Sequence, residues 1–135
     1  MADTIRKKSE IIALMANNVT GAVSAQDNRD FVESTMGSKE RTTVALSTYT
    51  LLDDDEILHV TRSATGVCTI TIPTALITDN RVFNIKDAGF NASNYNITVE
   101  TQGSEKIENS TADYIINSDG DSVQLYSDGI DLFIR

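Results

Sequence analysis

The sequence has one cysteine, one proline and no tryptophan among its 135 residues, and aromatic residues make up only 6% of it. The single Cys68 excludes an internal disulfide and any zinc site built from several cysteines. No apolar run approaches the roughly 20 residues that cross a bilayer as a helix. The first thirty residues also lack the clean hydrophobic stretch of a secretory signal, so we expect no cleaved leader and no membrane insertion.

Positive charge is also scarce. The chain has 11 Lys and Arg residues against 20 Asp and Glu, which gives a formal net charge of −9 at pH 7. Proteins that bind phosphate backbones do so with clustered basic side chains. Here the basic residues are scattered, apart from residues 6–8 near the N-terminus. We therefore expect no nucleic-acid partner.

The front of the chain, residues 1–38, has the periodicity of helices. Ser24 and Asp27 approximate a capping box, which predicts that a helix begins at Ser24. This helix has only one narrow apolar face, which includes Phe31 and Val32, so it cannot form a core of its own. We predict that residues 1–38 are a helical attachment segment that leans on a partner surface.

From about Val44 the period changes from 3.6 to 2, which favours strands. Short runs rich in Thr, Val and Ile alternate with turn signals about every 8 to 12 residues, a spacing typical of a β-sandwich or barrel. The runs are "TYTLL", "ILHVTR", "VCTITIP", "RVFNIKD", "YNITVET", "ADYIIN", "SVQLY" and "IDLFIR". We predict a mainly β fold: a short-stranded β-sandwich or barrel-like domain over residues 39–135, preceded by the small helical segment.

Local patterns sharpen this prediction. The run "VCTITIP" should place Cys68, Ile70 and Ile72 on one face, and Pro73 should end the strand because it has no backbone N–H. The tripeptides at 118–120 and 127–129 are both Ser-Asp-Gly, which predicts two hairpin-type turns with Gly at positive φ.

The sequence stops at Arg135, directly after the apolar run Ile130–Ile134. We expect this run to be a strand pinned inside a sheet, with no tail beyond it. A long shaft or a separate receptor-binding tip would then have no room in the chain.

Catalytic and metal-binding candidates are weak. His59 has no second imidazole to share a metal and reads as a strand residue, while Cys68 alternates with isoleucines and reads as buried. Residues 53–56 are four adjacent acids, which could hold a hard cation, but their spacing matches no EF-hand and a solvated turn explains them better. The aspartates of the later turns read as turn formers; they are Asp119, Asp121, Asp128 and Asp131. We expect no enzyme, no cofactor and no metal.

Two stretches resemble structural proteins of tailed bacteriophages. The first, "NNVTGAVSAQDNRDFVEST" at residues 17–35, is similar to a T-T-G-x-I-S-A-Q-D-x-R-D-F-V pattern near the start of such proteins. Ten residues fit it, and Val19 and Val23 depart mildly; the fitting residues are Thr20, Gly21, Ser24, Ala25, Gln26, Asp27, Arg29, Asp30, Phe31 and Val32. The second, from Tyr49 to Arg135, is similar to a module of phage fibres and capsid appendages. It follows the patterns Y-T-V-x-x-D-D, with Leu51 in the place of Val, R-x-(Y/F)-x-I-K-D, N-I-T-(V/I) and S-V-x-L-x-S-D-G.

The resemblance implies a homotrimeric protein of the virion surface, made in the host cytoplasm and bound to the major capsid protein or another virion protein. Its attachment residues would be Ser24, Gln26, Asp27, Arg29, Asp30, Phe31 and Val32. We expect a small capsid decoration, head-fibre or adaptor protein. The alternatives are a small tail-fibre or receptor-binding protein that touches the host surface and, less favoured, a carbohydrate-binding β-module.

Overall fold

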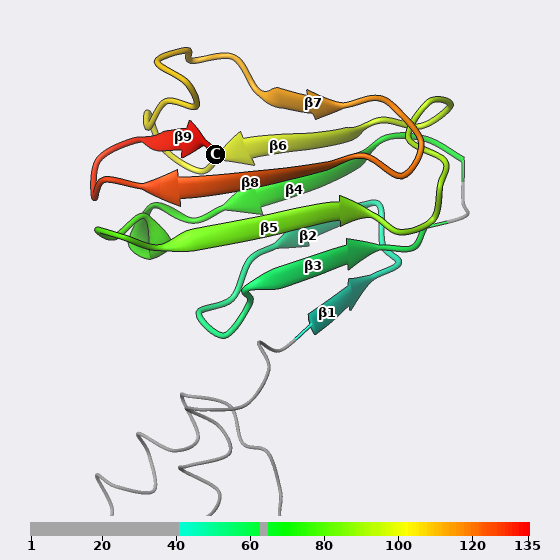
Figure 1. Cartoon of the computed structure of the whole chain (residues 1–135), viewed down its shortest axis with the longest axis horizontal. Coiled ribbons are helices and arrows are strands. Elements are labelled where there is room, and N and C mark those ends of the chain that lie inside the picture. Colours follow the sequence, from blue (N-terminus) through cyan, green and yellow to red (C-terminus); the bar gives the residue numbers. More distant parts are fainter. Residues whose placement is uncertain (1–40, 63–64) are drawn as a thin grey trace, which may run out of the picture. The chain divides into compact units, whose positions relative to one another are not determined.

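The computed structural model describes residues 41–62 and 65–135, and within these ranges the chain is mainly β. Two sheets contain all of the strands in the described ranges (Figure 1). The first sheet has the order β1-β3-β5-β8-β9, with the bounds Arg41–Val44, Ile57–Val60, Val82–Asp87, Ser122–Ser127 and Leu132–Ile134. The second has the order β2-β4-β6-β7, with the bounds Thr48–Thr50, Cys68–Ile72, Ile97–Thr101 and Tyr114–Ile116. A 3₁₀ turn, η1, spans Thr74–Leu76.

The chain alternates between the two sheets from β1 to β6, so that neighbouring strands in each sheet are parallel. This path is that of a two-sided β-solenoid with three turns. The turns differ in length, because Arg41 aligns with Ile57 and Ile57 aligns with Asn84. Because the turns have unequal lengths, the solenoid path leaves no regular repeat in the sequence. After β6 the chain turns back, and β7, β8 and β9 are added antiparallel to their neighbours.

The core lies between the two sheets and is built from alternate residues of each strand. In β4, Cys68, Ile70 and Ile72 are buried while Thr69 and Thr71 are half-buried, which confirms the predicted alternation. Phe83 and Ile85 of β5 are likewise fully buried. Burying such large side chains is the main favourable term in folding.

Threonines cover the outer face of the second sheet. Thr48, Thr69 and Thr98 lie side by side on three parallel strands, and Thr50 and Thr71 form the next row. Branched side chains that stand in such cross-strand rows fit a pleated surface well. This placement explains why a chain poor in aromatics can form a long series of short strands.

Several sequence predictions are corrected by the fold. The first strand, β1, begins earlier than the pattern indicated. The turn 118–120 is not a hairpin, because β7 and β8 belong to different sheets, whereas the turn 127–129 does join the antiparallel pair β8 and β9. The last strand, β9, is shorter than the predicted run Ile130–Ile134, and Ile130 itself is 72% exposed. This strand lies at the edge of its sheet rather than inside it.

Candidate functional site

The predicted attachment residues lie outside the part of the chain that the structure describes. This applies to all seven of them and to the boundary at residue 38 between the two predicted domains. Their role therefore stays a prediction.

His59 and Cys68 take the structural positions that the sequence indicated. His59 lies in β3 and is half-buried. Cys68 is 1% exposed, and its thiol lies 3.4 Å from the Leu46 carbonyl oxygen. Burial raises the pKa of the Cys68 thiol, although the Arg62 guanidinium acts in the opposite direction. A thiol with a raised pKa is a poor nucleophile.

The acidic turn 53–56 differs from the predicted solvated loop, because Asp55 is only 2% exposed and Asp54 and Glu56 are half-buried. Its carboxylate accepts hydrogen bonds from the Thr42 and Tyr49 hydroxyls and from the Leu52 backbone N–H. These bonds join β1, β2 and the turn between β2 and β3. Asp55 therefore closes this end of the β-sandwich.

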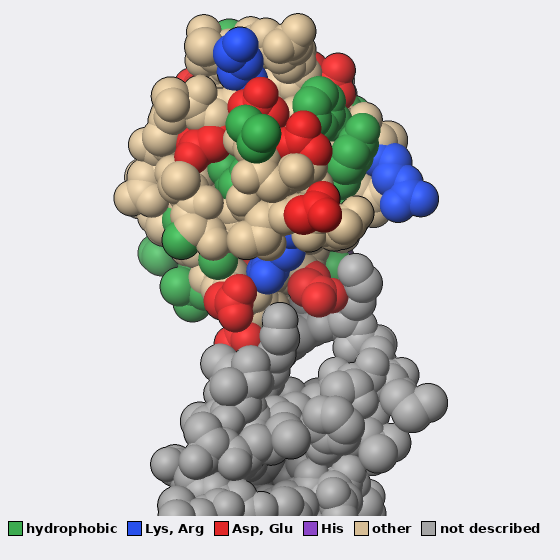
Figure 2. All heavy atoms as spheres, turned by 90° about the vertical axis from the view of Figure 1, so that its left-hand side faces the viewer, with side chains coloured by type: hydrophobic (Ala, Val, Ile, Leu, Met, Phe, Trp, Pro, Cys, Tyr) green, Lys and Arg blue, Asp and Glu red, His purple; other side chains and the backbone are tan. Residues whose placement is uncertain are grey.

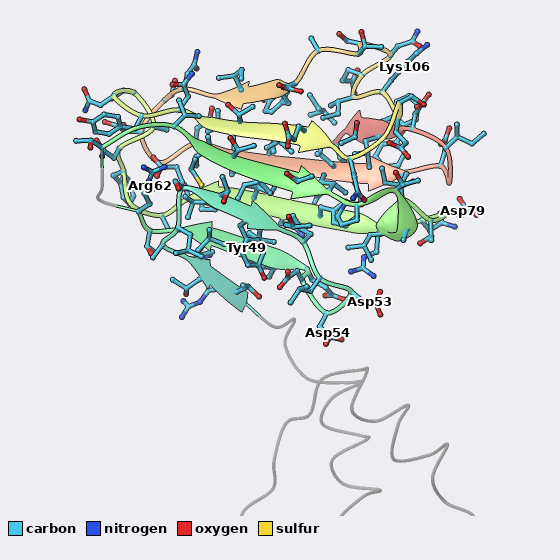
Figure 3. The ribbon with its side chains drawn as sticks, turned by 180° about the vertical axis from the view of Figure 1, so that it is seen from behind. Tyr49, Asp53, Asp54, Arg62, Asp79 and Lys106 are labelled. Atoms are coloured by element: carbon cyan, nitrogen blue, oxygen red, sulfur yellow. The ribbon has the colours of Figure 1, made fainter. Side chains whose placement is uncertain are left out.

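Arg81, the residue before β5, holds the same turn. Its guanidinium donates to the Asp53 carboxylate at 3.1 Å and to the Asp53 backbone carbonyl. The Arg81 guanidinium also lies 5.5 Å from the centre of the Phe83 ring. Asp53 and Asp54 lie at the same end as Asp79 (Figure 3), and acidic side chains are spread over this end (Figure 2). The described residues contain no group of three or more His, Cys, Asp or Glu side chains arranged to hold a metal ion.

The opposite end of the sandwich is organised by Asp87, which is the last residue of β5 and only 3% exposed. Its carboxylate accepts four backbone hydrogen bonds from two loops: from Gly89, Asn91 and Ala92 after β5, and from Gly120 before β8. The distances are between 3.0 and 3.2 Å. Burial alone would raise the pKa of Asp87, but these hydrogen bonds together hold it below its usual value. Asp87 thus fixes both loops as a charged group.

Between these hydrogen-bonded amides stands Phe90, which is 68% exposed. Its backbone is left-handed, with φ of 52°, a conformation that bulky residues rarely adopt. The ring lies against Gly120, where an added Cβ would come within 2.6 Å of the Phe90 Cε1 atom. The Lys86 ammonium lies over the ring, 5.5 Å from its centre, and donates to the Gly120 carbonyl.

The two loops that hold Phe90 also carry polar side chains. The amides of Asn91 and Asn94 are hydrogen-bonded to each other at 3.2 Å. The Asp119 carboxylate accepts the backbone N–H of Ser93 at 2.9 Å, which ties the loop after β5 to the loop before β8. We call Phe90, Asn91, Asn94 and Asp119, presented on the Asp87-held loops, the Phe90 site.

Arg62 lies at the same end of the sandwich (Figure 3) and is 8% exposed. Its guanidinium donates to the backbone carbonyls of Thr65 and Val67, and so closes the loop between β3 and β4. The Arg62 carbonyl also lies where a Cβ on Gly89 would come within 3.1 Å, so that Gly89 allows the two loops to pack closely.

No sequence pattern pointed to the Phe90 site. "AGFNASN" has the composition of a turn, and only the isolated Phe among small and polar residues signals something more. An aspartate directly after a buried strand is a second signal, since such a carboxylate can accept the amides of the loop that follows.

Comparison with known proteins adds no relative: no family model and no curated protein matches the chain. Among the described residues, no helix has the length and apolar character needed to cross a membrane.

Proposed function

We propose that this chain is a structural protein of a tailed-phage virion, a small capsid decoration, head-fibre or adaptor protein with no catalytic activity. The observation that carries the proposal is the resemblance of residues 17–35 and of the chain from Tyr49 onward to phage appendage proteins. In this proposal the first 38 residues bind the particle, and the β-rich part is displayed on its surface.

The residues that carry the second resemblance form hydrogen bonds that hold turns and loops of this fold, which supports that resemblance. In Y-T-V-x-x-D-D, the first and last positions are Tyr49 and Asp55, which are hydrogen-bonded at 2.8 Å. In R-x-(Y/F)-x-I-K-D, the first position is Arg81, which holds the acidic turn, and the last is Asp87, which holds two loops. Ser127 of S-V-x-L-x-S-D-G is 1% exposed, and its hydroxyl accepts the Gly129 N–H at 2.9 Å. The shared positions are therefore the ones that close this fold.

We further propose that the protein is a homotrimer whose partner is the major capsid protein or another virion protein. The outer faces of both sheets suit burial in an oligomer, because they mix threonines with apolar and amide side chains. Val82 and Asn84 of β5 and Thr69 and Thr71 of β4 are all half-buried on these faces. With a free cysteine and no disulfide in the described ranges, contacts between copies would add the stability that an external particle protein needs.

The test is immunogold electron microscopy of purified particles with antibodies against the β-rich part. Label on the head supports the decoration or head-fibre role. Label on the tail favours the alternative, a small tail-fibre or receptor-binding protein. Particles without label would overturn the virion role, and size exclusion coupled to light scattering would overturn the trimer if it gave a single species near the chain mass of 14.7 kDa.

A further inference from the structure

The exposure of Phe90 is not explained by folding. A large aromatic side chain stabilises a fold by leaving water, yet Phe90 is 68% exposed. Its left-handed backbone adds strain that persists only where the surrounding structure enforces it, and such residues cluster at functional sites. The exposed ring and the left-handed backbone of Phe90 therefore both lower the stability of the fold.

The ring is also held in one place. Amides on both sides of Phe90 bond to the buried Asp87 carboxylate, which also binds the Gly120 N–H. Gly120 leaves the space in which the ring lies, and Lys86 covers the ring from one side. A side chain fixed in this way before binding loses little freedom when a ligand arrives.

The surroundings of the ring select the ligand. Within residues 86–94 and 117–121, Phe90 is the only large apolar side chain that is exposed. These two loops by themselves therefore do not form the contiguous apolar core with few charges that a protein–protein interface has. The same two loops carry the amide groups of Asn91 and Asn94 and, next to Gly120, the carboxylate of Asp119.

We propose that the Phe90 site binds a pyranose ring of a neutral glycan. A pyranose has one face of C–H groups that can pack on an aromatic ring, and a rim of hydroxyls that both donate and accept hydrogen bonds. Phe90 supplies the apolar platform, and Asn91, Asn94 and Asp119 supply the polar partners. The exposed carboxylates of Asp119 and Asp121 and the net charge of −9 disfavour sialylated or uronic-acid glycans. This inference goes beyond the virion role and does not depend on the chain's place in the particle.

The test uses the full chain on a printed array of oligosaccharides built from neutral hexoses, N-acetylhexosamines, sialic acid and uronic acids. Saturation-transfer NMR with the free form of each bound oligosaccharide then identifies the sugar protons that touch the protein. We expect binding of neutral sugars, with the strongest transfer to C–H protons of one face of one ring. Binding of acidic glycans alone, or of no glycan on the array, would overturn the proposal.

Three variants assign the binding to the site. Phe90→Tyr keeps the ring and should bind like the parent, whereas Phe90→Leu keeps an apolar side chain without the ring and should bind at least about tenfold more weakly. Gly120→Ala places a Cβ against the ring and should also weaken binding. The matched control is Ile130→Ala, at an exposed apolar residue in the turn between β8 and β9.

Thermal unfolding of each variant shows whether the fold is kept, and Phe90→Tyr against Phe90→Leu decides even if Gly120→Ala fails to fold. Equal glycan binding by Phe90→Tyr and Phe90→Leu would contradict the proposal. Capture of a purified virion protein through Phe90, without glycan binding, would also contradict it and would assign the site to protein docking.

Discussion

The two ends of the β-sandwich are each closed by a buried aspartate, and the two aspartates have different partners. Asp55 accepts two side-chain hydroxyls and one backbone N–H, and it joins the edge strands β1 and β2 to the turn before β3. Asp87 accepts four backbone N–H groups and joins two loops. A hydroxyl can turn toward water when its partner is lost, whereas a backbone amide in a fixed loop cannot.

This difference predicts how each end responds to damage. The Asp55 end is a tie between strands that keep their ladder bonds without it. The Asp87 end has loops whose shape depends on the carboxylate itself, and one of these loops presents Phe90. We therefore expect the Asp87 end to be more sensitive to loss of its carboxylate than the Asp55 end.

The largest effect is expected from Asp87→Ala. A buried amide left without a partner costs about 1–3 kcal/mol. The Ala92 amide is buried and the other three are partly buried, so losing their common acceptor should lower the free energy of unfolding by at least about 3 kcal/mol. The measurement is chemical denaturation followed by circular dichroism. Asp113→Ala, at an exposed aspartate before β7, is the matched control and should stay within about 0.5 kcal/mol of the parent. A loss at Asp87 no larger than at Asp113 would remove the basis of the comparison.

The contribution of the Asp87 carboxylate to stability should depend on pH. Because the hydrogen bonds lower the pKa of Asp87 below the ordinary value of 3.8, the folded state binds this proton less readily than the unfolded chain. The stabilisation is therefore present above the ordinary value and is lost as the pH falls through the lowered value. The asparagine variant Asp87→Asn cannot titrate, so the difference in unfolding free energy between it and the parent should shrink as the pH falls below about 4. A difference that stays constant with pH would show that the charge contributes nothing.

A smaller effect is expected at the other end from Asp55→Ala. The variant leaves the Thr42 and Tyr49 hydroxyls and the Leu52 amide without their acceptor, but the two hydroxyls can reorient toward solvent. We expect a loss of about 1–3 kcal/mol, the cost of one unsatisfied buried group, and a smaller loss than for Asp87→Ala. The comparison uses the same denaturation measurement. The reverse order of the two variants would show that tying the edge strands matters more than shaping the loops.

The positions of the strands could be predicted from the sequence better than the way in which the strands pair. Strands such as β4 and β5 could be predicted because apolar and polar residues alternate within each short run, and Pro73 marks the end of β4. Parallel pairing was not foreseen, since nothing local distinguishes a strand that pairs with its neighbour in sequence from one that crosses to the other sheet. The turn 118–120 was taken as a hairpin for the same reason.

The two buried carboxylates show what local patterns leave out. Asp55 lies in an acidic run that indicates solvent exposure, and the hydrogen bonds from Thr42, Tyr49 and the Leu52 N–H make its burial favourable. Phe90 lies in a run with turn composition, and its fixed position comes from Asp87 and from Gly120, about thirty residues away in the sequence. In both cases a partner distant in sequence contributes, Thr42 for Asp55 and Gly120 for Phe90.

The smallest effect is expected from Tyr49→Phe, which removes one hydroxyl from the Asp55 end and leaves the ring in place. One hydrogen bond of this kind contributes about 1 kcal/mol, so the unfolding free energy should fall by roughly that amount.

The pKa of the Tyr49 phenol gives a second measurement of the same hydrogen bond. Burial, the hydrogen bond to Asp55 and the Asp55 charge together raise the pKa of Tyr49 to about 12 from its ordinary 10.0. Because the folded state holds this proton more tightly, the contribution is complete below pH 10 and is lost as the pH rises toward 12. Titration of the tyrosinate absorbance should show a late step that Tyr49→Phe removes and that Asp55→Asn moves to lower pH. A late step that persists in Tyr49→Phe would mean that a different phenol is held at this end, and the pairing of Tyr49 with Asp55 would have to be abandoned.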